Sequence, residues 1–532
     1  MNATTAATLL ATLIALGSPG PGHAHHAVDF DNLRRQIEDI RNDANVPGAA
    51  LVIVNRDGII RSAGFGVADN DSGEAVTPDT AFRIGSVTKI FTAAALVQLA
   101  RREDFSLDDP VSRYVPAGMF YNRWEAEQPI TVAHLLEHTS GFRDWTKAEF
   151  DHNVALDLEQ GLAFSPQSRT TYWKPGLHSV YSNSNYGLAG LVLERVSGRN
   201  YEALIRDTLF DPLEMRTATS LPARTAHLAT GYDRDGTTPI PYWHMIQRPA
   251  AAINATPRDM AALVSMLLAY GNYRQHTVLT PAEVNRIESP RTSLAARSGL
   301  RFGYGLGIYA QYRNGFYFMG HGGDGDGYLS RFGYCRQLGA GYFLAINSAN
   351  PQALRRMRRT IENELTRDHR PPAAPPIARL DANLLHRYSG RYALAAWRFD
   401  WQSGEYVSGR ILQVGAAADG RLFTQESDGE RKPLLPVSER SFRRGDQNGA
   451  TSGFYEEGGL LYFQEDDNWV KVAELATDPV DDAEPARSGA SARGTAHAYA
   501  SETVTLQNNP IKPATSNKTS VPDRWRLITR DD

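Results

Sequence analysis

The sequence predicts a mixed α/β (α+β) fold, in which an antiparallel sheet is flanked by helices and interrupted by an inserted helical domain, with a small all-β domain after it. Three observations favour this arrangement. Strand patterns accompanied by a helix occur near the start and again at 303–366, and helical patterns fill the interval. A proline-rich segment at 370–376 precedes a region of short strand patterns and glycine turns. The length of 532 residues suits two or three domains.

The two halves of the sheet are predicted from hydrophobic patterning. Residues 30–40 carry apolar side chains at helical spacing, and the apolar run at 47–55 predicts a buried strand. A turn at Arg56-Asp-Gly58 leads to a returning strand at 59–67. The second half is predicted by strand patterns and a closing helix at 303–312, 315–319, 328–335, 341–346 and 351–366. Helical patterns between the halves occupy 89–101, 131–137, 186–197, 201–210 and 257–269.

Domain boundaries follow from changes in composition. Arg370-Pro-Pro-Ala-Ala-Pro-Pro376 predicts a stiff linker. We therefore expect a first domain over 28–368, a linker over 369–379 and an all-β sandwich or barrel over 380–476. From Thr477 the chain is poor in large apolar residues, which predicts a disordered tail over 477–532.

The first residues resemble a secretory leader. Residues 6–16 form an apolar run that is too short to span a membrane, and a small-residue cleavage site follows near Ala24. Residues 1–24 are therefore predicted to be a signal peptide, although the first five residues lack the usual Lys or Arg. We expect a periplasmic or secreted protein, or a cytoplasmic one if the leader is not a signal peptide. No later stretch has the length and apolarity of a membrane-spanning helix.

Charge and cysteine content exclude several classes of function. The net charge of −4 and the pI of about 6.4 favour neither nucleic acid nor an anionic membrane surface as a partner. The single cysteine, Cys335, excludes a disulfide framework and a zinc site built on several thiolates. The sequence calls for no cofactor and no metal.

The strongest chemical motif is Ser86-Val-Thr-Lys89, which opens an apolar helical pattern. Three residues apart at a helix start, Ser86 and Lys89 lie on one face. A serine hydroxyl needs a base to become a nucleophile, and a lysine serves as that base when burial and nearby cations lower its pKa. Alone, the motif fits equally well a helix-capping serine followed by a solvated lysine.

Two further motifs supply groups that could act with this pair. Tyr181-Ser-Asn183 precedes a helix; a phenol can relay protons, and an amide can hold Lys89 or a substrate amide, or else these residues simply cap the helix. His321-Gly-Gly-Asp324 could donate a hydrogen bond or a positive charge to a carboxylate or oxyanion, and Gly323 would let a substrate approach the backbone. The alternative for this segment is a glycine-rich hairpin turn, while calcium is disfavoured because the ligand spacing is wrong.

The three motifs occur together in the order and spacing of the serine β-lactamase and penicillin-binding-protein superfamily, which this chain resembles over roughly residues 28–367. Tyr181 points to the class C-related branch, which includes D-alanyl-D-alanine carboxypeptidases, D-aminopeptidases and esterases. Segments 131–141 (Thr-Val-Ala-His-Leu-Leu-Glu-His-Thr-Ser-Gly) and 248–254 (Arg-Pro-Ala-Ala-Ala-Ile-Asn) are similar to others typical of that branch. The segment after the linker, opening at Tyr388, is similar to the lipocalin-like module that follows this catalytic domain in many members.

The resemblance implies roles for matching residues. Ser86 would form an acyl-enzyme, and Lys89 with Tyr181 would move its proton to the leaving group. The backbone N–H groups of Ser86 and Asp324 would form the oxyanion hole. Asn183 and His321 would orient the substrate.

The chain also departs from the classical β-lactamases, because His321 and Gly322 stand where those enzymes carry a lysine and a hydroxyl residue. The substrate is therefore expected to be a small D-amino-acid-containing peptide. The alternative substrates are a small ester or a β-lactam-like compound. The alternative function is that of a penicillin-recognising sensor that acylates slowly. Phe142, Trp145 and Trp173 lie in loops near the expected site; either they form an apolar or aromatic acyl pocket or they are ordinary core residues, and the sequence leaves both interpretations open.

Overall fold

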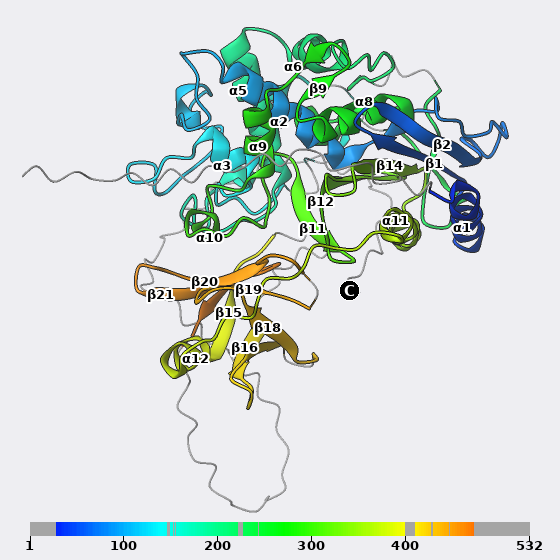
Figure 1. The fold of residues 1–532 in the computed structure, drawn as a ribbon. Helices are drawn as coiled ribbons and strands as arrows, with labels where there is room; N and C mark the ends of the chain where they lie inside the picture. Colours follow the sequence, from blue (N-terminus) through cyan, green and yellow to red (C-terminus); the bar gives the residue numbers. More distant parts are fainter. Residues whose placement is uncertain are drawn as a thin grey trace, which may run out of the picture.

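The computed structural model describes residues 28–145, 149, 151–152, 154, 156–221, 227–242, 244–398, 410–426, 429–445 and 447–472. Figure 1 shows an upper body of sheet and helices and, beneath it, a body of strands drawn in yellow to orange. The predicted signal peptide (1–24) and the predicted tail (477–532) lie outside the described residues. None of the described helices is long and apolar enough to cross a membrane.

The upper body contains a six-stranded antiparallel sheet in the order β11-β12-β13-β14-β1-β2. Within it β1 pairs with β14, so that Leu51 lies opposite Leu344. The early and late strands therefore form one sheet, as predicted. Its strands are β1 (Gly48–Asn55), β2 (Gly58–Gly66), β11 (Tyr309–Arg313), β12 (Phe316–Gly325), β13 (Tyr328–Cys335) and β14 (Ala340–Ile346).

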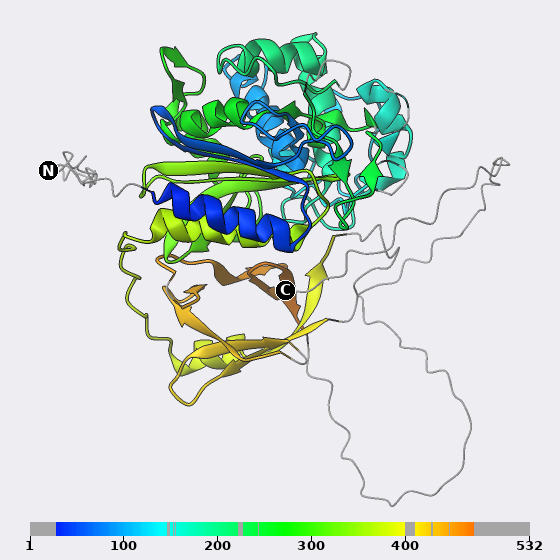
Figure 2. The same ribbon diagram turned by 90° about the vertical axis from the view of Figure 1, so that its right-hand side faces the viewer.

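Helices cover both faces of this sheet. Figure 2 shows α1 (Phe30–Asp43) and α11 (Pro351–Thr366) together below it, and α8 (Pro257–Leu268) packs on the other face. Along β1, Leu51 and Ile53 belong to the core under α1 and α11, whereas Val52 and Val54 belong to the core under α8. Burial on both faces is the reason that β1 is apolar at every position rather than at alternate ones.

The inserted part, between β2 and β11, is mainly helical. Several of its helices begin at side-chain caps: Thr256 accepts from the backbone N–H of Asp259 at the start of α8, with Pro257 in the first turn. The other helices are α2 (Thr88–Leu99), α3 (Val132–Leu136), α4 (Leu158–Ala163), α5 (Asn183–Ser197), α6 (Tyr201–Ile205), α7 (Arg248–Ala251), α9 (Pro281–Glu288) and α10 (Leu294–Arg297). Short two-residue strands include β3 (Phe82–Arg83) and β8 (Asn254–Ala255), which pair with each other.

The lower body is a closed barrel of strands β15 to β22, which decides between the two predicted all-β forms. A short helix, α12 (Ala382–Tyr388), precedes it; Tyr388 stacks on Phe454 with ring centroids 4.2 Å apart. The strands are β15 (Gly390–Ala396), β16 (Ile411–Ala416), β17 (Leu422–Glu426), β18 (Lys432–Pro436), β19 (Ser441–Arg443), β20 (Ser452–Glu457), β21 (Leu460–Gln464) and β22 (Asn468–Lys471).

Two strand boundaries near the predicted site were wrong. The predicted strand at 303–312 begins only at Tyr309, because Gly303 and Gly307 have φ angles of +150° and +75° that break the extended chain. The predicted strand at 315–319 instead continues to Gly325. Gly322 and Gly323 pair with Arg331 and Ser330 of β13, so this glycine-rich segment is a strand and not the alternative hairpin turn.

Candidate active site

Ser86 lies in a short 3-10 turn, η1 (Gly85–Val87), between β3 and α2. The turn is held by β8, because Ile84 donates its backbone N–H to the carbonyl of Ile253 at 2.9 Å. Ser86 is half-buried, whereas the residues on either side of it are fully buried. The hydroxyl is therefore fixed at the start of a buried apolar helix while it remains reachable.

The backbone of β12 lies directly against this turn. A Cβ atom placed on Gly85 would come within 2.6 Å of the backbone nitrogen of Asp324, and one on Gly323 within 1.8 Å of the Ile84 carbonyl oxygen. Only glycines permit this approach. It brings the turn that carries Ser86 next to the amide of Asp324, the two elements predicted to form an oxyanion hole.

Lys89 lies on the first turn of α2 and is fully buried. Its Nζ lies 3.0 Å from Ser86 Oγ, 2.7 Å from Asn183 Oδ1 and 2.9 Å from the carbonyl oxygen of Ala250. Burial lowers the pKa of Lys89 well below its usual range; the charge of Asp144 opposes this effect and that of Arg398 adds to it. A neutral amine has two N–H groups for the two carbonyl-type oxygens and one lone pair for the serine proton.

Tyr181 lies in the loop before α5 and is half-buried. Burial raises the pKa of the phenol above its usual range, while a hydrogen bond with Ser86 lowers it. Lys89 Nζ lies 4.9 Å from the centre of the Tyr181 ring. The phenol therefore keeps its proton near neutral pH. In this pair the neutral amine of Lys89 can accept a proton, and the phenol of Tyr181 can relay one.

Asn183 is the first residue of α5, and its orientation is set by a carboxylate that the sequence reasoning did not single out. Asp144 is buried and accepts the backbone N–H of Asn183 at 2.7 Å, at the positive end of α5. The side-chain amide of Asn183 donates to the same carboxylate at 3.3 and 3.4 Å. The amide oxygen is thus turned toward Lys89, as the 2.7 Å contact requires.

His321 is buried on β12, and of the two roles expected for it, a hydrogen bond or a positive charge, the structure favours the hydrogen bond. Burial holds the pKa of His321 well below its usual range, so the imidazole is neutral. Its Nε2 lies 2.8 Å from the hydroxyl of Tyr304. A hydrogen-bonding role for His321 would therefore pass through Tyr304.

A residue of the barrel reaches this cluster. Arg398, which follows β15, donates from Nε to Asp144 Oδ2 at 2.6 Å, and its guanidinium lies 4.9 Å from the centre of the Tyr181 ring.

The segment that leads to Arg398 is held by Trp173, whose indole N–H donates to the carbonyl of Ala395 at 2.7 Å. Trp173 thus contacts the barrel, whereas Phe142 and Trp145 are core residues of the upper body. The aromatic-pocket interpretation of Phe142 and Trp145 was therefore wrong.

The family model described as Beta-lactamase matches residues 33–366, a span that contains Ser86, Lys89, Tyr181 and His321. The chain belongs to the beta-lactamase family. The resemblance inferred from the three motifs is confirmed.

Curated relatives of this beta-lactamase family member match part of the chain. Protein flp of Staphylococcus aureus (strain MW2) is 31% identical over 231 residues, which are 42% of this chain and 46% of that protein. Penicillin-binding protein 4 of Amycolatopsis lactamdurans is 29% identical over 258 residues, 47% of this chain and 65% of that protein. The chain thus spans about half the length of the first of these relatives.

Solved structures of beta-lactamase-like proteins share the fold. The octameric penicillin-binding protein homologue from Pyrococcus abyssi has a TM-score of 0.53 and 22% identity, covering 83% of this chain and all of that one. The Beta-lactamase/D-alanine Carboxypeptidase from Yersinia pestis has a TM-score of 0.51 and 22% identity, with 63% and 99% covered. EstCE1, described as a hydrolase with promiscuous acyltransferase activity, has a TM-score of 0.51 and 19% identity, with 64% and 100% covered.

The two family-like segments at 131–141 and 248–254 lie against the candidate site of this beta-lactamase family member. His138 accepts the backbone N–H of Ser182 at 3.2 Å and packs its ring 4.3 Å from that of Tyr181. In the second segment, Pro249 packs closely against Gly190 of α5: a Cβ atom added to Gly190 would lie only 2.1 Å from Pro249 Cγ. Helix α7 therefore lies close to α5. This contact places the Ala250 carbonyl beside Lys89.

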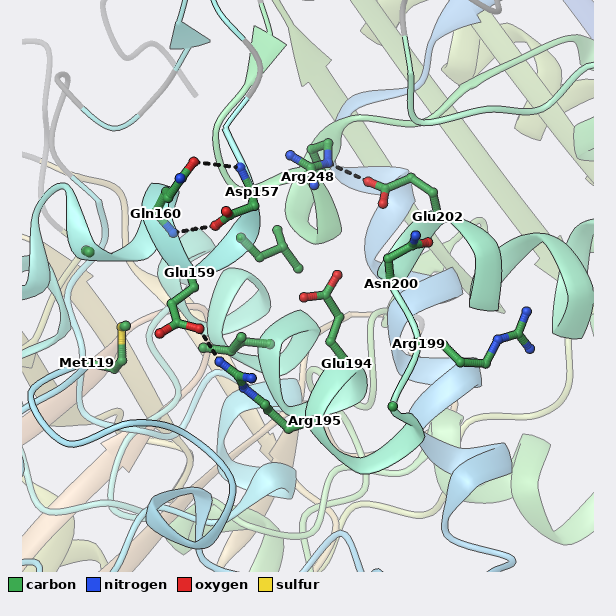
Figure 3. Close-up of a pocket in the computed structure, with 14 residues that line it drawn as sticks. Met119, Asp157, Glu159, Gln160, Glu194, Arg195, Arg199, Asn200, Glu202 and Arg248 are labelled. Atoms are coloured by element: carbon green, nitrogen blue, oxygen red, sulfur yellow. Dashed lines mark hydrogen bonds and ion pairs between the residues drawn. The ribbon is translucent and has the colours of Figure 1, made fainter.

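A hollow lies away from the cluster, between α4, the end of α5 and the start of α6 (Figure 3). Two ion pairs lie among its lining side chains, Arg195 with Glu159 and Arg248 with Glu202. None of the predicted site residues lines it. Among the residues that the structure describes, no group of three or more His, Cys, Asp or Glu side chains is arranged to hold a metal ion.

Replacing Gly85 with Ala is expected to reduce kcat/KM by about 10²-fold or more, the usual effect of disturbing one oxyanion donor. The new Cβ would lie 2.6 Å from the Asp324 nitrogen and must displace β12. Steady-state kinetics on an activated ester would measure the loss. Gly339→Ala is the matched control, since Gly339 has a similar positive φ (+63° against +53°) but open space around it. Equal losses in both variants would contradict the oxyanion assignment.

Proposed function

We propose that the chain is a serine hydrolase that acts through an acyl-enzyme on Ser86, most readily on D-amino-acid-containing peptides as a carboxypeptidase or aminopeptidase. The observation that carries the proposal is the buried amine of Lys89 at 3.0 Å from Ser86 Oγ, with its pKa well below the usual range. A buried lysine that donates to two carbonyl-type oxygens retains its lone pair for the serine proton.

The proposed reaction has two halves. Lys89 takes the proton of Ser86, whose Oγ attacks the substrate carbonyl carbon, and the oxyanion is held by the backbone N–H groups of Ser86 and Asp324. Tyr181 passes a proton to the leaving amine or alcohol as the carbonyl–heteroatom bond breaks. The proton held by Lys89 then restores that of Tyr181. Water attacks the acyl-enzyme and gives its proton to the same pair, which returns a proton to Ser86 Oγ as the ester bond breaks and the carboxylic acid is released.

The choice of substrate rests on two supports. One solved structure with the same fold is named a Beta-lactamase/D-alanine Carboxypeptidase, and a periplasmic or secreted location, which we also propose, would expose the protein to peptidoglycan fragments. The neutral state of His321 supports ranking β-lactam hydrolysis lower, because no cation at that position would hold the β-lactam carboxylate. An esterase or acyl transferase is the second candidate, favoured by the like fold of EstCE1.

The test compares the wild-type protein with Ser86→Ala on a D-Ala-D-Ala peptide, a p-nitrophenyl ester and a chromogenic cephalosporin, with turnover and intact mass followed together. We expect peptide turnover that the variant lacks. Ester turnover alone would favour the esterase, and a stable adduct without turnover would favour a slow-acylating sensor. Equal behaviour of wild type and variant on every substrate would overturn the proposal.

A further inference from the structure

The barrel is connected to the nucleophile by a continuous series of hydrogen bonds. Arg398 donates to Asp144 at 2.6 Å, Asp144 accepts from the amide of Asn183, Asn183 accepts from Lys89 at 2.7 Å, and Lys89 lies 3.0 Å from Ser86 Oγ. The side chain of Asp144 is fully buried, whereas that of Arg398 is 47% exposed. The carboxylate is thus a fixed part of the upper body, and its ion-pair partner comes from the barrel side.

The charges around Lys89 are few. Two charged groups face it, the Asp144 carboxylate, which favours the ammonium form, and the Arg398 guanidinium, which disfavours it. Burial keeps the neighbouring phenols and imidazoles neutral: Tyr181, Tyr186, His138 and His321. Asp324, near the end of β12, also interacts with Arg398: burial raises the pKa of this carboxyl to about 6, and the charge of Arg398 lowers it. The protonation state of the amine therefore depends on how far Arg398 offsets Asp144.

Asp144 is required to orient Asn183, but its negative charge favours the ammonium form of Lys89 and so opposes the action of Lys89 as a base. It aligns the amide of Asn183 and accepts the first N–H of α5. An unpaired carboxylate at this place would hold a proton on Lys89, and an ammonium group has no lone pair for Ser86. An ion pair with Arg398 retains the alignment and removes most of that field.

We propose that Arg398 is a positioning residue, supplied from the barrel side, that offsets the charge of Asp144 and so keeps Lys89 in the neutral form that Ser86 requires. The proposal rests on the proposed function of Lys89 as base. It gives the barrel a part in the chemistry: an upper body without the docked barrel segment retains Ser86, Lys89 and Tyr181 but has a more basic amine.

The test measures the rate of Ser86 acylation by an uncharged p-nitrophenyl ester against pH, in the full-length protein. An uncharged ester is used so that recognition of a substrate carboxylate cannot produce the effect. On the acid side of the profile, the acid limb, the rate falls as Lys89 becomes protonated. In Arg398→Gln this acid limb is expected to move up by about one pH unit, since removing a nearby positive charge shifts a pKa such as that of Lys89 by about 1–3 units. Activity below the limb then falls about tenfold per unit and recovers at alkaline pH.

Three further variants make the result specific. Arg398→Lys retains the charge and is expected to restore most of the acid limb. Arg398→Gln combined with Asp144→Asn removes both charges and is expected to bring the limb back, at a reduced rate, because the Asn183 amide loses its alignment. Arg387→Gln breaks an exposed pair with Glu456 elsewhere on the barrel and should leave the profile unchanged.

The outcomes separate this inference from the proposed function. If Ser86 of the wild-type protein is never acylated, the proposed function fails. If it is acylated and Arg398→Gln retains the wild-type acid limb, or loses rate equally at every pH, Arg398 has only a structural role and the inference is overturned. Thermal unfolding of Arg398→Gln and Arg398→Lys shows whether the fold is intact in both.

Discussion

Lys89→Met is expected to lower the rate of Ser86 acylation by about 10²–10⁴-fold, the usual contribution of a general base. Met is an unbranched side chain of similar length that fills the buried space without a charge. The oxygens of Asn183 and Ala250 lose their donor, which costs about 1–3 kcal/mol of stability for each buried group left unsatisfied. Stopped-flow measurement of the first turnover with an activated ester would isolate the acylation step.

Lys89→Arg distinguishes a base from a simple hydrogen-bond donor. Arginine keeps its proton in proteins, so it can donate to Asn183 but cannot accept from Ser86. We expect it to be as inactive as Lys89→Met across the accessible pH range. Substantial acylation by the Arg variant would mean that a neutral amine is not required, and the proposed mechanism would fail.

Glu137→Ala is expected to reduce the free energy of unfolding by about 3–5 kcal/mol, as is usual when one partner of a buried ion pair is removed. Glu137 is buried and accepts from Arg286 at 2.7 Å and from the backbone N–H groups of Arg291 and Thr292, each at 2.7 Å. The hydroxyl of Thr292 also donates to this carboxylate, at 2.8 Å, and all four donors would lose this acceptor. Denaturant unfolding followed by tryptophan fluorescence would measure the change.

An exposed pair provides the control for Glu137. Asp79 and Arg258 form an ion pair at 2.7 Å, but their side chains are 64% and 59% exposed. Asp79→Ala is expected to cost at most about 1 kcal/mol. A small effect of Glu137→Ala, comparable to that of Asp79→Ala, would show that the 137–141 segment is held mainly by its packing.

Sequence patterns predicted the parts of the fold that depend on local periodicity. The strand at 328–335 and the helix at 351–366 begin and end where predicted, because each is bounded by turn residues and has a clear apolar pattern. The strand starting at Tyr309 was predicted to begin earlier, since glycine φ angles are not visible in hydrophobicity. Helix α12 was missed because its seven residues lie within a region dominated by strand patterns.

The candidate site was predictable to the extent that its residues lie in motifs. Ser86, Lys89 and Asn183 were proposed from short spacings, and the structure brings them into contact. Asp144 and Arg398 carry no such signal. An acidic residue in a loop and an arginine near the end of a strand are both common. These two residues are also 254 positions apart in the chain, so no local pattern connects them. The neutral state of His321 likewise depends on burial, which only the folded structure reveals.

The pairing of β1 with β14 also governs the order in which the chain can fold. Strand β1 is made early in synthesis, yet its neighbour at residues 340–346 is made nearly three hundred residues later. Until then one edge of β1 has no strand to receive its hydrogen bonds, and an apolar edge of this kind is prone to aggregation. Contacts between such distant segments also slow folding. A growing chain of this protein therefore passes through a long interval in which its most apolar strand needs shielding by other means, such as a chaperone.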